Sequence, residues 1–256
     1  MKRLIILGGN PETSYLVDTL KKNGLHIILI DPTPNSPAKK NANESYDLDC
    51  LNYSELKKLT KKISPDGILV GVADILVENY FKLCKDLNYP TYATEKALLS
   101  FKDKFSFIKI CQKFGINVTP YHMVKRNDDL KNYNFSFPLF VKPIDNGGGL
   151  GMSVAESSEE LNKSIIKAFK FTRSDHVLVE KLMSCDDLFC HYTFVNGEYF
   201  VTAIGDRYTT KKSQSGSKVC IGASYPSKHS EKFLEKVHPK LLDLFSYLEL
   251  KNGIMN

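Results

Sequence analysis

Residues 138–152, PLFVKPIDNGGGLGM, decide how the rest of the chain is interpreted. The apolar residues at the start are typical of a short buried strand, and Lys142 comes near the end of that strand. The loop that follows has four glycines in the five residues Gly147–Gly151. Glycine lacks a Cβ and tolerates positive φ, so the backbone N–H groups of such a loop can converge on an anion. A lysine beside the loop adds a charge for the same anion, and the stretch therefore predicts a phosphate site, most simply for a nucleoside triphosphate.

Two other phosphate-binding motifs do not match the order of these residues. A P-loop has its lysine after the glycines, whereas Lys142 precedes Gly147 by five residues. A dinucleotide-binding loop opens a helix, whereas the residues from Met152 to Ala155 are typical of a strand. The remaining structural alternative is a glycine-rich hairpin turn that binds nothing.

The composition favours a globular protein of two or three subdomains, with 256 residues, 42% hydrophobic residues and a net charge of +6. No apolar segment is long enough to span a membrane, and the lysines are dispersed, so we expect neither a membrane nor nucleic acid as a partner. The six cysteines form no C-x-x-C pair, so we expect a cytoplasmic protein with no disulfide framework and no zinc site.

The first hundred residues alternate between predicted strands and helices. This alternation predicts an open parallel sheet with helices on both faces. The strands are expected at 4–7, 26–30 and 67–72, and the helices at 11–22, 55–62 and 76–87.

The same region contains a partial dinucleotide fingerprint. Gly8 and Gly9 follow the first strand, and Asp31 ends the second, where an acid could hold a ribose hydroxyl. The third glycine is missing, and Glu12 would face the pyrophosphate. An NAD(P)-dependent oxidoreductase is therefore an alternative function. A lone acid in the position of Asp31 is, however, more commonly a strand-end residue.

The second part of the chain mixes helices with hairpins. Asn196-Gly197 favours a type I′ turn between strands at 188–195 and 198–204. Ser230 is expected to cap a helix over 231–250, which Pro239 would kink. The other expected elements are helices at 102–114 and 158–171, a strand starting within 115–120, a strand at 176–182 and a polar loop at 208–217.

The order strand, lysine, glycine loop, strand resembles the ATP-grasp enzymes, in which a glycine-rich flap joins two antiparallel strands and closes over ATP. The fold that this resemblance implies is α/β. Residues 1–100 would form a Rossmann-like pre-ATP-grasp domain. Residues 101–184 would form the small subdomain with the flap, and 185–256 the start of the large subdomain of an α+β ATP-grasp domain that is incomplete at its C-terminus.

The resemblance also implies a set of phosphate-binding residues. Lys104, in the sequence Lys102-Asp103-Lys104, matches the lysine that reaches the α-phosphate, with Lys102 as the alternative. Lys142 matches the lysine that contacts the α- and β-phosphates. The flap would be formed by Gly147, Gly148, Gly149, Gly151 and Met152.

A second set would hold the nucleoside. Residues Glu180, Lys181, Leu182 and Met183 resemble the hinge strand, where backbone groups after the glutamate pair with the adenine edge and apolar side chains cover the ring. Glu180 could instead be a salt-bridge partner. Asp187 is the candidate for the ribose hydroxyls, with Asp186 as the alternative. No catalytic residue is assigned.

The pattern is most similar to the carbamoyl-phosphate-synthase-like carboxylate–amine ligases. Such an enzyme uses ATP to activate a carboxylate as an acyl phosphate, which an amine then attacks. The family binds Mg²⁺ with acidic residues on later strands, and Asn256 is reached where the first of these would begin, so no metal ligand is assigned. We therefore expect a fragment or a chain completed by a second chain, and we expect residues 1–256 alone to bind a nucleotide weakly and to be inactive. A homo-oligomer is the other expected assembly. A non-catalytic nucleotide-binding remnant or subunit is a further alternative.

Overall fold

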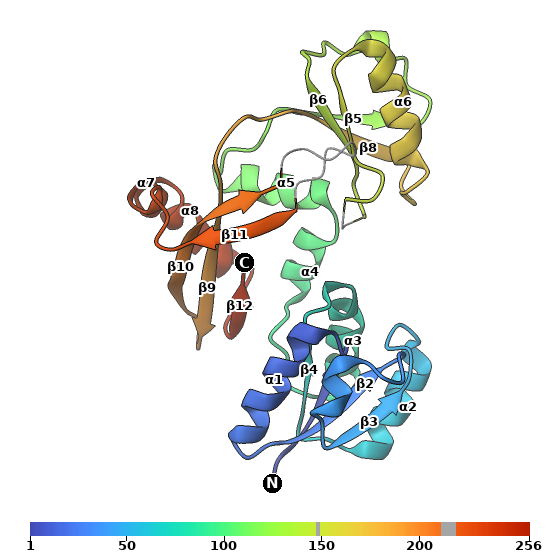
Figure 1. The fold of residues 1–256 in the computed structure, drawn as a ribbon, viewed down its shortest axis with the longest axis vertical. Coiled ribbons are helices and arrows are strands. Elements are labelled where there is room, and N and C mark those ends of the chain that lie inside the picture. Colours follow the sequence, from blue (N-terminus) through green and yellow to red (C-terminus); the bar gives the residue numbers. More distant parts are fainter. Residues whose placement is uncertain (147–148, 211–218) are drawn as a thin grey trace. The chain divides into compact units, whose positions relative to one another are not determined.

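The computed structural model describes residues 1–146, 149–210 and 219–256, and Figure 1 shows their fold. The chain divides into two compact units, Met1–Thr94 and Glu95–Asn256. The finer division of the second unit at residue 184 stays a prediction. In the described part of the chain, no helix is both long and apolar enough to cross a membrane.

Unit 1 (Met1–Thr94) is built on a parallel sheet, as the alternation of elements predicts. Its four described strands are arranged in the order β3-β2-β1-β4, and every neighbouring pair is parallel. The predicted strands are confirmed, and the edge strand β3 was not predicted because it is short and only half-buried. The bounds are β1 (Arg3–Leu7), β2 (His26–Asp31), β3 (Glu44–Asp47) and β4 (Gly67–Val70).

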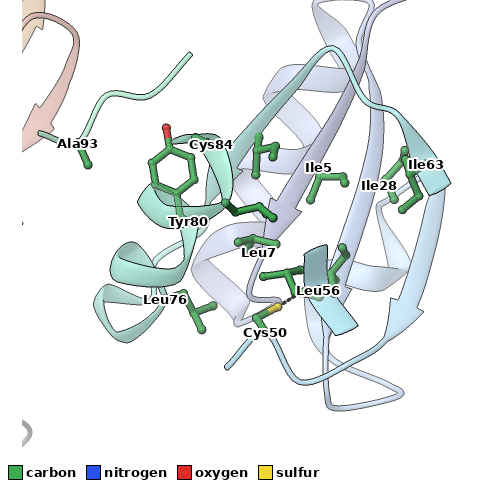
Figure 2. Close-up of a cluster of buried hydrophobic side chains, with 13 residues drawn as sticks. Ile5, Leu7, Ile28, Cys50, Leu56, Ile63, Leu76, Tyr80, Cys84 and Ala93 are labelled. Carbon is green, nitrogen blue, oxygen red and sulfur yellow. Dashed lines mark hydrogen bonds between the residues drawn. The ribbon is translucent and has the colours of Figure 1, made fainter. Parts of the chain in front are cut away.

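Helices pack against both faces of this sheet. On one face, Ile6 and Leu29 pack with Val17 of α1 (Pro11–Lys22). On the other, Ile5 and its neighbours pack with α2 (Tyr53–Ile63) and α3 (Val77–Leu87), which contribute Leu56 and Tyr80 among others (Figure 2). Because β1 and β2 are covered on both faces, their side chains form an almost continuous apolar run. Single 3₁₀ turns at Pro37–Lys40 and Asp74–Leu76 complete the unit.

Unit 2 (Glu95–Asn256) contains an antiparallel sheet with the described order β5-β8-β6-β7. The strands are β5 (Tyr121–Lys125), β6 (Leu139–Pro143), β7 (Ser153–Ala155) and β8 (His176–Lys181), and a 3₁₀ turn spans Leu130–Asn132. Leu161 and Ile165 of α6 (Ser158–Phe169) pack on this sheet. The glycine segment therefore joins two antiparallel neighbours, β6 and β7, as predicted.

A second antiparallel sheet of unit 2 has the described order β11-β10-β9-β12. Asn196 and Gly197 both have positive φ (52° and 86°) between β9 and β10, which confirms the turn. Tyr192 and Phe194 of β9 pack against Leu244 and Phe245 of α8 (His238–Tyr247). The bounds are β9 (Asp187–Val195), β10 (Glu198–Thr209), β11 (Cys220–Ser224) and β12 (Gly253–Met255).

Several predicted helix and loop bounds are wrong. The helix predicted at 102–114 is α5 (Lys104–Lys113), preceded by a separate helix α4 (Glu95–Phe101). The chain at 231–250 forms α7 (Ser230–Lys236) and α8 (His238–Tyr247), because Pro239 is accommodated in the first turn of a new helix, where no N–H partner is needed. Ser230 does not cap α7; its hydroxyl donates to the carbonyl of Ser227. The loop predicted at 208–217 starts too early because β10 continues to Thr209, and its residues from 211 on lie outside the described part.

Candidate functional site

A cavity of about 970 Å³ lies in unit 2, large enough for a bound nucleotide. Its apolar lining comes from α4, α5, α7, α8 and β9, and includes Phe107, Phe189 and Phe245. Its charged lining comes from the start of α5, from the ends of β6 and β8, and from the residues just before the glycine segment, which is defined as residues 147–151. The charged and amide residues there are Lys102, Asp103, Lys104, Lys142, Asp145, Asn146 and Glu180.

Lys104 is held at the cavity by the start of α5. Asp103 caps this helix by accepting from the N–H of Ser106 at 2.7 Å, which fixes Lys104 as the first helical residue. The Lys104 N–H donates to the carbonyl of Ile144 at 2.9 Å, and its ammonium donates to the carbonyl of Asn146. Burial, followed by repulsion from Lys142, lowers the pKa of Lys104. Lys104 thus carries a partly desolvated charge beside the glycine segment.

Lys142 reaches the same cavity from β6. Its ammonium lies 2.6 Å from Glu180 Oε2, and the two side chains are only 18% and 11% exposed. An ammonium has three donors, so Lys142 can keep Glu180 and still bind a further oxygen. The structure therefore brings together Lys104, Lys142 and Glu180, with Glu180 in the salt-bridge role that was the alternative interpretation.

The glycine segment is described only at its C-terminal end, because Gly147 and Gly148 lie outside the described residues. Gly149 and Gly151 have positive φ (78° and 72°). A Cβ on Gly151 would lie 2.7 Å from Phe171 Cβ and 2.8 Å from Pro143 Cγ, so this glycine is required for close packing. The Met152 carbonyl accepts from the ammonium of Lys167 at 2.9 Å. Gly149, Gly151 and Met152 are not among the described residues that line the cavity.

The proposed hinge follows directly after Glu180. The N–H groups of Lys181 and Leu182 donate to the carbonyls of Pro120 and Pro138, each at 3.0 Å. Because proline has no N–H, neither Pro120 nor Pro138 can return a hydrogen bond. The carbonyls of Lys181 and Leu182 therefore receive no hydrogen bond from these two prolines, and Lys181, Leu182 and Met183 are not among the described residues that line the cavity. Met183 is 49% exposed.

The two ribose candidates begin the next strand. Asp187 is the first residue of β9 and is paired in register with Arg207. Asp186 accepts from Lys228 at 2.9 Å and from His229 at 3.0 Å, and these bonds lower the pKa of its carboxyl. Their neighbour Leu188 lines the cavity, whereas neither aspartate is among the described residues that do.

The acidic residues at the cavity do not form a metal centre. Within residues 1–146, 149–210 and 219–256, no three His, Cys, Asp or Glu side chains are grouped to hold a metal ion. Asp103 is engaged by Ser106 and Glu180 by Lys142. The described carboxylates therefore do not fit Mg²⁺, and no chemical step is assigned to a metal here.

The acid required by the dinucleotide alternative in unit 1, Asp31, also has its carboxylate oxygens occupied. The two carboxylate oxygens of Asp31 accept from the N–H groups of Gly9 and Thr33, both at 2.8 Å. A smaller hollow of about 240 Å³ opens beside these residues. Asp31 is thus a loop cap, and its oxygens are already committed to the backbone.

Sequence analysis did not single out Asp145 and Asn146. Asp145 accepts from the hydroxyl of Thr172 and, at 3.0 Å, from the N–H of Arg173. An aspartate at the start of a loop is a signal for a turn cap, but partners 27 and 28 residues away cannot be identified from one sequence.

Comparison with known proteins agrees with this geometry. Residues 110–238, just over half of the chain, match the family described as D-ala D-ala ligase C-terminus. Formate-dependent phosphoribosylglycinamide formyltransferase from Bacteroides fragilis is 25% identical over 190 residues, covering 73% of this chain and 49% of that protein. The carbamoyl phosphate synthase large chain of Pyrococcus furiosus is 30% identical over 186 residues, covering 67% of this chain and 17% of that protein.

A solved structure extends the similarity to the whole fold. N5-carboxyaminoimidazole synthetase from Staphylococcus aureus, crystallised with ADP, superposes with a TM-score of 0.79 at 15% identity, over 99% of this chain and 65% of that chain. The chain spans about half the length of the curated relatives that it matches. The predicted α/β architecture and the predicted resemblance are both confirmed: this chain belongs to the ATP-grasp superfamily, in the family of the D-Ala–D-Ala ligase C-terminus.

Proposed function

We propose that the cavity of unit 2 binds ATP, and that the protein is a ligase in which ATP activates a small carboxylate as an acyl phosphate for attack by an amine. The observation that carries the proposal is the meeting of Lys104 and Lys142 in one cavity, from elements 38 residues apart in the sequence. Two partly buried ammonium groups beside a glycine segment suit a polyphosphate better than a neutral ligand.

The lysines would act by binding and by neutralising charge. Lys104 would hold the α-phosphate, and Lys142 the α- and β-phosphates, while Glu180 keeps the Lys142 side chain oriented. Phosphoryl transfer depends mainly on such positioning and electrostatic stabilisation, so no nucleophilic side chain is needed. The described carboxylates do not form a Mg²⁺ site, so no part of this neutralisation is assigned to the metal.

The nucleoside would lie along the hinge. The carbonyls of Lys181 and Leu182 would accept from the base, and the Leu182 and Met183 side chains would cover its ring. Asp187 is proposed for the ribose hydroxyls, with Asp186 as the alternative; the Asp186 carboxylate accepts from Lys228 and His229. Gly147, Gly148, Gly149, Gly151 and Met152 are proposed to cover the phosphates.

Calorimetry with ATP tests the binding half of this proposal. We expect the wild-type chain to bind ATP, and Lys142→Met to bind it at least tenfold more weakly. Absence of ATP binding by the wild type would contradict the assignment of the cavity.

The ligase half needs a second measurement. Phosphate release from ATP is followed with Mg²⁺ and a panel of carboxylate–amine pairs, and a pair that stimulates release identifies the substrates. Binding of ATP with no stimulation by any pair would favour the non-catalytic nucleotide-binding alternative.

A further inference from the structure

Asp145 makes a double attachment between the glycine segment and the loop before β8. One carboxylate oxygen accepts from the Thr172 hydroxyl and the other from the Arg173 N–H at 3.0 Å. These hydrogen bonds help to keep the pKa of the Asp145 carboxyl below its ordinary value, against the opposing effect of burial. The Asp145 carboxylate is therefore held by the hydroxyl of Thr172 and the N–H of Arg173, although the residue is exposed to solvent.

The residues around Asp145 strengthen the same attachment. The Asn146 side chain donates to the carbonyl of Phe171 at 3.0 Å. Gly151, at the other end of the segment, packs against Phe171 so closely that a Cβ would overlap it. Asp145 and Asn146, just before the glycine segment, and Gly151, at its end, are thus all held by residues 171–173.

The attachment leads directly to Lys104. The carbonyls on either side of Asp145 are the two acceptors that hold this lysine: Ile144 accepts from its N–H and Asn146 from its ammonium. Moving Asp145 would therefore move both acceptors.

We propose that Asp145 is a positioning residue for phosphate binding: with Thr172 and Arg173 it fixes the backbone of residues 144–146, and this backbone holds Lys104 at the cavity. The proposal rests on the proposed function of the cavity in binding ATP. It also explains how an acidic side chain is tolerated among phosphate-binding lysines, since both of its oxygens are engaged away from the ligand.

Substitution of Thr172 gives the sharpest test, because it leaves the charge at residue 145 unchanged. Thr172→Ser keeps a hydroxyl that can donate to Asp145, whereas Thr172→Val removes the donor at nearly constant shape. We expect Thr172→Val to weaken ATP binding about three- to tenfold in calorimetry, and Thr172→Ser to stay within twofold of the wild type.

Asp145→Asn adds a readout that a merely structural role would not move. The charged groups facing Lys104 are Lys142 on β6, Glu180 on β8, Asp103 at its own helix start and Asp145. Loss of the Asp145 charge removes one of the attractions that favour the ammonium form. The alkaline limb of the pH profile for ATP affinity should therefore move to lower pH in Asp145→Asn.

Asp128→Asn is the matched control. Asp128 also accepts from one hydroxyl and one backbone N–H, those of Tyr133 and Lys125, in the same unit but away from the cavity lining. It should leave ATP affinity and its pH profile unchanged.

Equal ATP affinity of Thr172→Val, Thr172→Ser and wild type would overturn the proposal, provided that Lys142→Met still weakens binding. Loss of any effect of Lys142→Met would instead contradict the function of the cavity itself. If Asp145→Asn does not fold, as judged by circular dichroism, the two Thr172 variants decide the question.

Discussion

Two glycine-containing loops of this protein, Gly8-Gly9 in unit 1 and the glycine segment 147–151 in unit 2, differ in what surrounds them. In unit 1, the N–H of Gly9 donates to Asp31, and a Cβ on Gly9 would lie 2.4 Å from Ser36 Oγ and 2.9 Å from Leu29 Cδ2. The hollow beside it is lined by the acids Asp31 and Asp49. In unit 2, the cavity beside the glycine segment is lined by three lysines, Lys102, Lys104 and Lys142.

The difference teaches that glycines allow a loop to approach an anion but do not select one. At Gly9 the missing side chain serves internal packing, and the charged side chains among the described residues lining the hollow are those of Asp31 and Asp49, with no lysine or arginine. In the cavity of unit 2, where we propose a phosphate site, Lys102, Lys104 and Lys142 would attract a phosphate. The lining acids Asp103, Asp145 and Glu180 are engaged by other groups of the chain. Charge in the surroundings, rather than glycine content, is therefore expected to decide where a phosphate binds.

The largest expected effect is the loss of ATP affinity in Lys142→Met, which distinguishes the cavity of unit 2 from the hollow of unit 1. Lys142→Met removes a charge-assisted bond of about 1.5–3 kcal/mol, which corresponds to roughly 10- to 150-fold weaker ATP binding. It also leaves Glu180 without its partner, so unfolding free energy should fall by about 1–3 kcal/mol. Asp31→Asn in unit 1 is the control, and calorimetry should find its ATP affinity unchanged. A weakening by Asp31→Asn as large as that of Lys142→Met would remove the distinction between the regions.

Substitutions of the glycines should show that the two regions share a packing role. Gly151→Ala places a Cβ against Phe171 at positive φ, and Gly9→Ala places one against Ser36; overpacking of this kind costs about 1–3 kcal/mol. The strain at positive φ should make Gly151→Ala the more costly of the two.

Gly222→Ala is the matched control for these variants, because a Cβ there meets nothing within 4 Å. Urea unfolding should find it within about 0.5 kcal/mol of the wild type. If Gly9→Ala proves as neutral as Gly222→Ala, Gly9 is not a packing glycine.

The smallest expected effect concerns pH and Lys104. Its pKa is lowered in the folded protein by burial and by Lys142, so between the folded and unfolded pKa values the unfolded chain binds more protons. The contribution of Lys104 to stability therefore rises with pH in that window, while ATP affinity falls as the ammonium is lost. Lys104→Met should weaken ATP binding yet leave the melting temperature at neutral pH equal or slightly higher, unlike Lys142→Met. A clear drop in melting temperature would show that the bonds of Lys104 outweigh its desolvation.

Sequence analysis succeeded where the signal is local. The apolar runs of β1, β2 and β6, and the Asn196-Gly197 turn, depend on residues close together in the chain, and all were predicted. The edge strands β3 and β11 were missed, because short strands at a sheet edge that are half-buried or exposed show no apolar periodicity to detect. Pro239 was misinterpreted because proline is equally compatible with a kink and with the first turn of a new helix.

The candidate site divides in the same way. Lys142 could be named from its place before a glycine loop, and Lys104 from the resemblance of residues 102–104 to the ATP-grasp motif. Their convergence on one cavity, the ion pair of Lys142 with Glu180 and the attachment of Asp145 to Thr172 all join residues more than 25 positions apart. Such pairings depend on strand register and loop geometry, which a single sequence does not specify.

The prolines that flank the hinge have a consequence for base discrimination. Pro120 and Pro138 accept from the N–H groups of Lys181 and Leu182 but have no N–H to donate to the carbonyls of these residues, so the proposed hinge would present oxygen acceptors to a base. Adenine carries an exocyclic amino group that can donate to such acceptors, whereas guanine carries a carbonyl oxygen at the same position, which would repel them. Preference for one purine over the other would then come from two residues that need not touch the nucleotide at all.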